Sequence, residues 1–223
     1  MITKMMPTSP SGEAAKRCSL LRRRRDWTFE RFANHWAGPH AAIALTMPGI
    51  ARYTQNRVSE ELWVRGERFD CDGIVELEFR DEQSMAEAGK GEAVRTLLPE
   101  DEERFLDGIT LCRVQGGARQ MWPGMTKAML AGCLSKDRDF EALEAALVAS
   151  GCVQWSIDYV SATFHRQRLA YEDDPPQVFA NLWFEDGSNL SAAFSDGSKW
   201  GRMAGQVLRR GTVWRTDPLQ IVG

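Results

Sequence analysis

The sequence has few of the residues that most often mark a chemical function. Its 223 residues include three histidines and three tyrosines, and its cysteines number five. These are Cys18, Cys71, Cys112, Cys133 and Cys152. They lie far apart and form no Cys-x-x-Cys or mixed Cys/His spacing, so the pattern argues against a metal site and favours reduced, mostly buried thiols.

Long apolar runs and a strong overall charge are also missing. No run approaches the roughly 18 residues that cross a bilayer, and the opening MITKMMPTSPSGEAAKR lacks the order of a secretory signal. We therefore expect a cytoplasmic protein with no membrane partner. The net charge is −3, and the arginine run at residues 22–25 is typical of a solvated strand end. Without a basic stripe elsewhere, we expect no nucleic-acid partner.

What the sequence does contain is a repeated order of predicted elements. Residues 1–14, rich in Pro, Ser, Gly and Met, show no periodicity and are expected to form a flexible extension. Residues 15–120 predict the order β-α-β-β-α-β, with Thr28 and Asp81 as helix N-caps. Residues 125–223 predict the same order again, with Asp139 as a helix N-cap and Gly151 as its C-cap. The sequence therefore predicts two domains in tandem.

Two similar stretches of sequence support the interpretation of the two domains as a repeat. VELEFRD at residues 75–81 and ANLWFED at residues 180–186 align on Phe79 and Phe184. The turn formers in MWPGM, residues 121–125, suit a linker between the two units. A β-α-β-β-α-β unit is ferredoxin-like, with helices on one face of a four-stranded sheet. Because the strands are apolar on both faces, we expect an α+β fold in which the two units pack sheet to sheet.

The first unit resembles the EthD family of the dimeric α+β barrel superfamily. The resemblance rests on Phe32 and Trp36 followed by His40, on Met47 to Asn56 (MPGI.RY.QN), and on Asp72 to Phe79 (DGIVELEF). It is clear over about residues 16–115, and the second unit is similar by architecture alone. It implies a barrel-like body made of the two ferredoxin-like units.

The resemblance also implies a class of activity. Members of the family with known activity include cofactor-free isomerases, dehydratases and decarboxylases that act on lactones and aromatic polyketides. We therefore expect a cofactor-independent lyase or isomerase that transfers a proton on a small cyclic or aromatic carbonyl compound. Two alternatives stay open: a non-catalytic ligand-binding or accessory protein, and a relative of the haem or quinol monooxygenases. The sequence is also compatible with a homodimer.

His40 is the first candidate catalytic residue. Imidazole titrates near neutral pH, and the resemblance places this residue at the mouth of a cavity between helix and sheet. Gly38 and Pro39 precede it, so we expect the helix that begins at Thr28 to break near Ala37 and a second helix to begin at His40. The positive end of that helix would keep His40 neutral and ready to accept a proton. A histidine that merely packs a helix end is the alternative.

Tyr53 and Glu76 complete the predicted catalytic set. The Tyr53 phenol can donate a hydrogen bond to a developing oxyanion, although a half-buried strand tyrosine is the simpler interpretation. Glu76 lies between Val75 and Leu77 in an apolar strand, where a buried carboxylate would suit an acid or base. If it faces the helices or solvent, it is a surface residue.

The predicted ligand-binding residues are Trp36, Asn56, Trp155 and Asn181. Trp36 could stack on an aromatic ligand, although its spacing also fits a core residue. Trp155 and Asn181 occupy the second-unit positions of Tyr53 and Glu76 and would form walls of the pocket.

The remaining histidines are expected to have no role in the site. His35 points about 100° away from Trp36 around the helix and is expected on the polar face. His165 lies in a polar hairpin and is expected to face solvent. Because the first helix of the second unit has no histidine, we expect the site to belong to the first unit.

Overall fold

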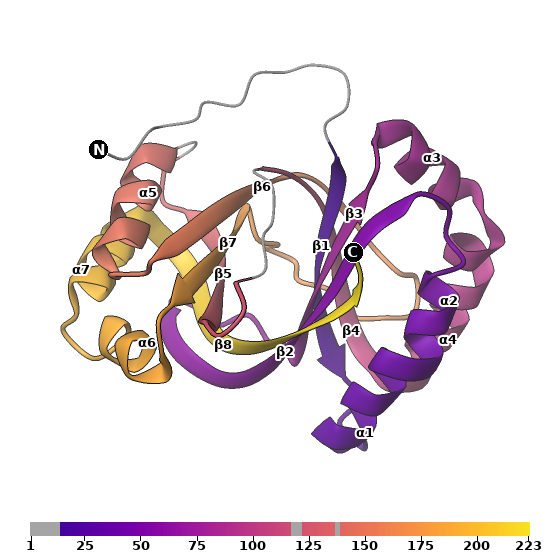
Figure 1. Cartoon of the computed structure of the whole chain (residues 1–223), viewed down its shortest axis with the longest axis horizontal. Coiled ribbons are helices and arrows are strands. Elements are labelled where there is room, and N and C mark those ends of the chain that lie inside the picture. The colour runs from indigo at the N-terminus through magenta and orange to yellow at the C-terminus, as the bar shows by residue number, and fades with distance from the viewer. Residues whose placement is uncertain (1–13, 117–121, 137–138) are drawn as a thin grey trace.

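The computed structural model of the chain describes residues 14–116, 122–136 and 139–223 (Figure 1). Nearly all of the predicted extension at residues 1–14 lies outside these ranges, as does Met121 of the expected linker.

The first half of the chain follows the predicted order of elements. Its elements are β1 (Ala15–Arg23), α1 (Phe29–His35), the π-helical turn η1 (Trp36–His40), α2 (Ala41–Ala44), β2 (Ile50–Arg65), β3 (Gly73–Phe79), α3 (Glu82–Lys90), the π-helical turn η2 (Ala93–Leu97), α4 (Leu98–Phe105) and β4 (Leu106–Gly116). The N-caps predicted at Thr28 and Asp81 are confirmed: the side chain of Thr28 accepts a hydrogen bond from Arg31 N, and that of Asp81 from Ser84 N. The N-cap predicted at Asp139 is wrong, because its side chain makes no capping hydrogen bond.

The second half has the same order, with a longer last strand than the sequence predicts. Its elements are β5 (Thr126–Leu134), α5 (Phe140–Ala149), β6 (Gln154–Phe164), β7 (Val178–Phe184), α6 (Gly187–Ala193), α7 (Lys199–Val207) and β8 (Leu208–Val222). The strand expected at LQIVG is therefore only the end of β8, which begins directly after α7.

The eight strands form one closed antiparallel barrel in the order β1-β3-β2-β8-β5-β7-β6-β4. Two junctions join the halves, because β2 pairs with β8 and β4 pairs with β6. Helices α1 to α4 cover one side of the barrel and α5 to α7 cover the opposite side (Figure 1). The expected α+β fold with a barrel-like sheet is confirmed, and the interpretation of the halves as duplicated domains stays a prediction.

The described residues form three apolar cores, because side chains along each strand point alternately to the inside and the outside of the barrel. In β3, Val75, Leu77 and Phe79 pack with Phe32 and Trp36 beneath the helices of the first half. A second core lies beneath α5 to α7. The third combines residues of both halves, such as Ile74 and Met129, and fills the barrel interior. Within the described residues, no helix is both long and apolar enough to cross a membrane.

The prediction that the helix breaks at Gly38 and Pro39 is wrong. Helices α1 and α2 are joined without interruption by η1, and His40 has helical dihedrals of φ −64° and ψ −44°. A π-turn is wider than an α-turn and accommodates a residue that lacks an N–H. His40 therefore lies inside a helix and not at its N-terminus, so the dipole argument for its neutral state does not apply.

Candidate functional site

Asp101 of α4 joins His35 and His40 through its two carboxylate oxygens. His35 Nε2 lies 3.0 Å from Asp101 Oδ1, and His40 Nδ1 lies 3.0 Å from Asp101 Oδ2. Because an ionised carboxylate can only accept hydrogen bonds, each of these ring nitrogens donates. The arrangement fixes the orientation of both imidazoles and leaves the second nitrogen of each ring available.

Burial in an aromatic environment isolates these contacts from solvent. The exposed fractions of the side chains are 3% for Asp101, 9% for His40 and 19% for His35. The ring of Phe105 packs on both imidazoles, with centroid distances of 4.8 Å to His35 and 5.1 Å to His40. Burial alone raises the pKa of Asp101, but the hydrogen bond from His40 and the charge of His35 outweigh it, so the pKa lies below its usual value.

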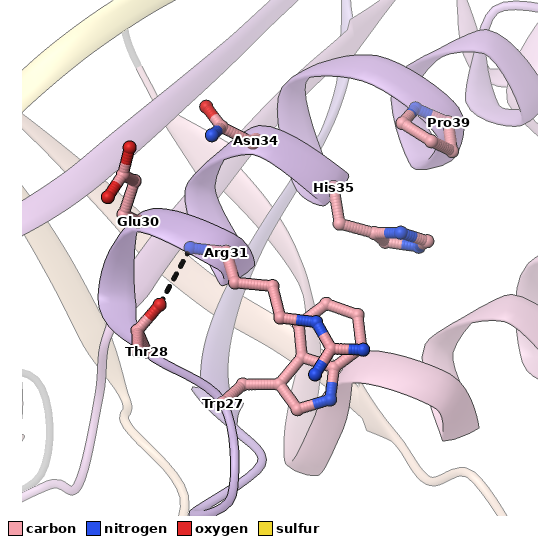
Figure 2. Close-up of a pocket in the computed structure, with 7 residues that line it drawn as sticks. All are labelled: Trp27, Thr28, Glu30, Arg31, Asn34, His35 and Pro39. Atoms are coloured by element: carbon pink, nitrogen blue, oxygen red, sulfur yellow. Dashed lines mark hydrogen bonds between the residues drawn. The ribbon is translucent and has the colours of Figure 1, made fainter.

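A groove of about 580 Å³ runs along α1 beside His35 (Figure 2). It is lined by Trp27, Thr28, Glu30, Arg31, Asn34, His35 and Pro39. The guanidinium of Arg31 lies 3.8 Å from the centroid of the Trp27 ring, which gives the groove a flat aromatic and cationic surface. Of the three residues in the His–Asp–His cluster, His35 is the one that lines this groove.

Tyr53 and Trp36 lie in the core between the helices and the barrel. The Tyr53 hydroxyl accepts a hydrogen bond of 2.8 Å from Gln55 Nε2, and burial raises the pKa of the phenol well above its ordinary value. Gln55 Nε2 also donates to Trp36 O. Among the described residues, Gln55 Oε1 is one of the side-chain atoms that are buried without a hydrogen-bond partner. Buried polar atoms of this kind are uncommon and fit a place where a water or ligand atom binds.

Glu76 and Asn56 come together, but inside the barrel and across the sheet from Tyr53. Lys127 of β5 donates hydrogen bonds of 2.8 Å to both Glu76 Oε2 and Asn56 Oδ1. Asn56 Nδ2 also donates to Glu76 Oε2 at 3.0 Å. The three side chains are nearly inaccessible to solvent. Neighbouring residues of a strand face opposite sides, so Glu76 and Asn56 cannot share a pocket with His40.

The two predicted residues of the second half lie apart from both groups that contain His40 or Tyr53. Asn181 is buried in the barrel, where Nδ2 donates to Ser156 Oγ at 3.4 Å. Trp155 is half-buried and packs on the core beneath α5 to α7. The structure therefore does not bring the seven predicted site residues together in one pocket.

Sequence reasoning missed His35, Asp101 and Lys127. The sequence predicts His35 on the polar face because neighbouring residues of an α-helix point about 100° apart, which turns it away from Trp36. The π-turn from Trp36 to His40 instead brings His35 and His40 to the same carboxylate. Asp101, between the apolar Leu98 and Phe105, was a detectable signal, since a buried carboxylate needs partners.

Among the described residues, no group of three or more His, Cys, Asp or Glu is placed to hold a metal ion.

Several solved structures share this fold at low sequence identity. One is described as an anthrone oxidase-like protein, with 12% identity, 93% of each chain covered and a TM-score of 0.62. Another is a candidate monooxygenase from Lactobacillus acidophilus, with 8% identity, 94% of each chain covered and a TM-score of 0.52. A third, from Fusobacterium nucleatum subsp. nucleatum, has 7% identity, coverage of 91% and 92%, and a TM-score of 0.53.

The family comparison agrees with the resemblance in the first half. Residues 24–109 match the EthD domain, a stretch that contains His35, His40 and Asp101. No curated protein sequence matches the chain.

Proposed function

We propose that the protein transfers a proton on a small cyclic or aromatic carbonyl compound that binds in the groove along α1. The observation that carries this proposal is the His35–Asp101–His40 cluster, in which the groove-lining imidazole is held by a buried carboxylate. The flat surface made by Trp27 and Arg31 suits a planar ligand that bears or develops negative charge.

The proposed step uses His35 as the base. Its Nε2–H donates to Asp101, so neutral Nδ1 presents a lone pair that takes the proton from the carbon next to the carbonyl group. The nearby carboxylate stabilises the imidazolium that forms, as in other acid–base pairs of this kind. His40 holds the second oxygen of Asp101 and keeps the carboxylate oriented.

The carbanion that results has more than one fate. Return of the proton at another position gives an isomerase, and loss of a leaving group gives a lyase. Reaction with dioxygen gives a monooxygenase, and the names of two fold neighbours, anthrone oxidase-like and monooxygenase, favour this second candidate. Each of these reactions begins with the same proton removal, so the proposal commits to that step.

Other roles from the sequence remain proposals beside it. Tyr53 would donate a hydrogen bond to a ligand oxygen within the core. Glu76 would act separately, inside the barrel. A non-catalytic binder would hold the same ligand in the groove without exchanging its protons.

The test is exchange of the ligand's carbon-bound hydrogens for deuterium, followed by proton NMR in heavy water. The probes are anthrone, simple lactones and phenolic ketones. We expect exchange by the wild-type protein and a loss of about 100-fold or more in His35→Ala, since a general base contributes about that much. Dioxygen uptake in the same samples separates oxygenation from isomerisation or elimination.

His165→Ala is the matched control. Its imidazole is exposed and stacks on Tyr171 with centroids 3.8 Å apart, away from the groove. Equal exchange rates in wild type and His35→Ala would contradict the proposal. Binding without exchange in the wild-type protein would favour the binder.

A further inference from the structure

The residue next to Asp101 is held by the second half of the chain. Glu102 is buried, and its carboxylate accepts two hydrogen bonds from the guanidinium group of Arg166. Nε donates to Oε2 at 2.6 Å and Nη2 donates to Oε1 at 3.1 Å. Arg166 Nη1 also donates to Val94 O in η2 at 3.4 Å. A bidentate arginine–carboxylate pair fixes both distance and orientation. Arg166 therefore ties together η2 and α4, the helix that carries Asp101.

Arg166 belongs to a segment that is docked along the first half. We call residues 165–172, which follow β6, the strap. Leu169 of the strap is buried in the core beneath α1 to α4. Ile109 N donates to Ala170 O at 2.8 Å, and Glu172 N donates to Thr110 Oγ1 at 3.0 Å. The strap is thus anchored on β4 by its backbone as well as by Leu169, and it holds Arg166 at a defined place.

Arg166 lies near other guanidinium groups, and Glu102 is its buried anionic partner. Burial lowers the pKa of Arg17, and the neighbouring guanidinium groups of Arg166 and Arg113 lower it further. An arginine in such surroundings is repelled unless a carboxylate compensates it. The Glu102 pair supplies that compensation, so the position of α4 and the position of Arg166 depend on each other.

We propose that Arg166 is a positioning residue for the His35–Asp101–His40 cluster, so that the second half of the chain completes the site of the first. This inference rests on the proposed function for its meaning, but its geometry stands by itself. Asp101 and Glu102 are adjacent in α4, and one carboxylate faces the histidines while the other faces the strap. Loss of the strap contact would release α4 and loosen both histidine hydrogen bonds.

The test compares Arg166→Gln with Arg168→Gln in protein labelled with ¹⁵N-histidine. Arg168 is the matched control, since it is also in the strap and pairs with a carboxylate of α4, Glu103, but is 77% exposed. The chain has three histidines, so His35→Ala and His40→Ala assign the spectrum. We expect the ring-nitrogen signals of His35 and His40 to shift and broaden in Arg166→Gln and to keep their wild-type positions in Arg168→Gln. Arg166→Lys should restore them only in part, because lysine lacks the fork.

A second variant covers the case in which Arg166→Gln does not fold. Glu102→Gln combined with Arg166→Gln removes the charged bidentate contact and leaves no lone buried carboxylate. Wild-type histidine signals in either folded variant would overturn the proposal. No substrate is used, so this result is independent of the deuterium-exchange assay. Failure of His35→Ala to affect exchange would leave the positioning result intact.

Discussion

Asp101 couples two histidines of unequal exposure through one buried carboxylate. His40 is enclosed by Phe105 and the helix, whereas His35 reaches the groove. At the scale of single residues, the proposed mechanism uses this asymmetry: the enclosed ring would orient the carboxylate and the accessible ring would meet the ligand. The geometry thus moves the candidate base from His40, where the sequence placed it, to His35.

We expect Asp101→Asn to lower the free energy of unfolding by about 1–3 kcal/mol at neutral pH, since it weakens hydrogen bonds to a buried charged group. The folded-state pKa of Asp101 lies below its ordinary value of 3.8. The carboxylate therefore stabilises the protein above that value, and its contribution is lost as the pH falls through the lowered pKa. Urea unfolding measured from pH 7 downward gives the free energy of unfolding of variant and wild type. We expect the difference between these two free energies to become smaller below pH 3.8.

Glu100→Gln is the control for this measurement, because Glu100 is an exposed carboxylate of the same helix. A difference between Asp101→Asn and wild type that does not change with pH would contradict the argument.

Gly73 sets the position of Trp36 beneath α1. A Cβ at Gly73 would lie 2.5 Å from Trp36 Cζ3, so Gly73→Ala forces the indole to move. We expect this substitution to destabilise the protein by about 1–3 kcal/mol, as overpacking of a core does. Gly89→Ala in α3 meets no atom within 4 Å and should stabilise by about 0.5–1 kcal/mol through helix propensity. Chemical denaturation of both variants checks this, and an equal loss in the two would refute it.

At the scale of elements, the two π-turns of the first half lie where the site is built. η1 carries His40, and η2 runs directly into α4 with Asp101. Gly38 and Pro39 predict a departure from regular α-helix at this point, and the structure has one there. Whether a proline breaks a helix or widens one turn depends on the packing of the helix on both sides of it, which a local pattern does not contain.

Two aspartates at helix N-cap positions, Asp186 and Asp139, differ in whether the side chain makes a capping hydrogen bond. Asp186 accepts a hydrogen bond of 2.8 Å from Asn189 N at the start of α6, whereas the side chain of Asp139 makes no capping bond at the start of α5. We expect Asp186→Ala to cost about 1 kcal/mol of stability and Asp139→Ala less than about 0.5 kcal/mol. Thermal unfolding monitored by circular dichroism measures both. Equal costs would show that the cap bond does not decide the difference.

At the scale of the whole molecule, the Lys127–Glu76 pair joins the halves inside the barrel. Loss of one partner leaves an uncompensated buried charge, so we expect Lys127→Met to destabilise the protein by about 3–5 kcal/mol. Adding Glu76→Met should recover part of that loss. Arg209→Met, which breaks an exposed pair with Asp174, should cost less than about 1 kcal/mol. Urea unfolding of the three variants tests the ranking, and a Lys127→Met cost no larger than that of Arg209→Met would contradict it.

Much of this architecture was predictable from periodicity and turn residues. The apolar strands and the caps at Thr28 and Asp81 led to the element order and to two sheets packed face to face, and the family resemblance implied the barrel-like body. The site was predicted less well, because Tyr53 and Glu76 are neighbours in pairing strands but face opposite sides of the sheet. The strap contact from Arg166 to Glu102 was not predictable, since no local pattern relates residues so distant in the chain.

Closure of the barrel also constrains the order in which the protein forms during synthesis. β2 pairs along most of its length with β8, the last strand of the chain. On a ribosome, β1, β3 and β4 can pair with one another while one side of β2 has no partner. That side stays exposed until the residues of β8 leave the exit tunnel, and an unpaired strand edge is a site of aggregation. We therefore expect nascent chains that stall before β8 to depend on chaperones far more than the finished protein does.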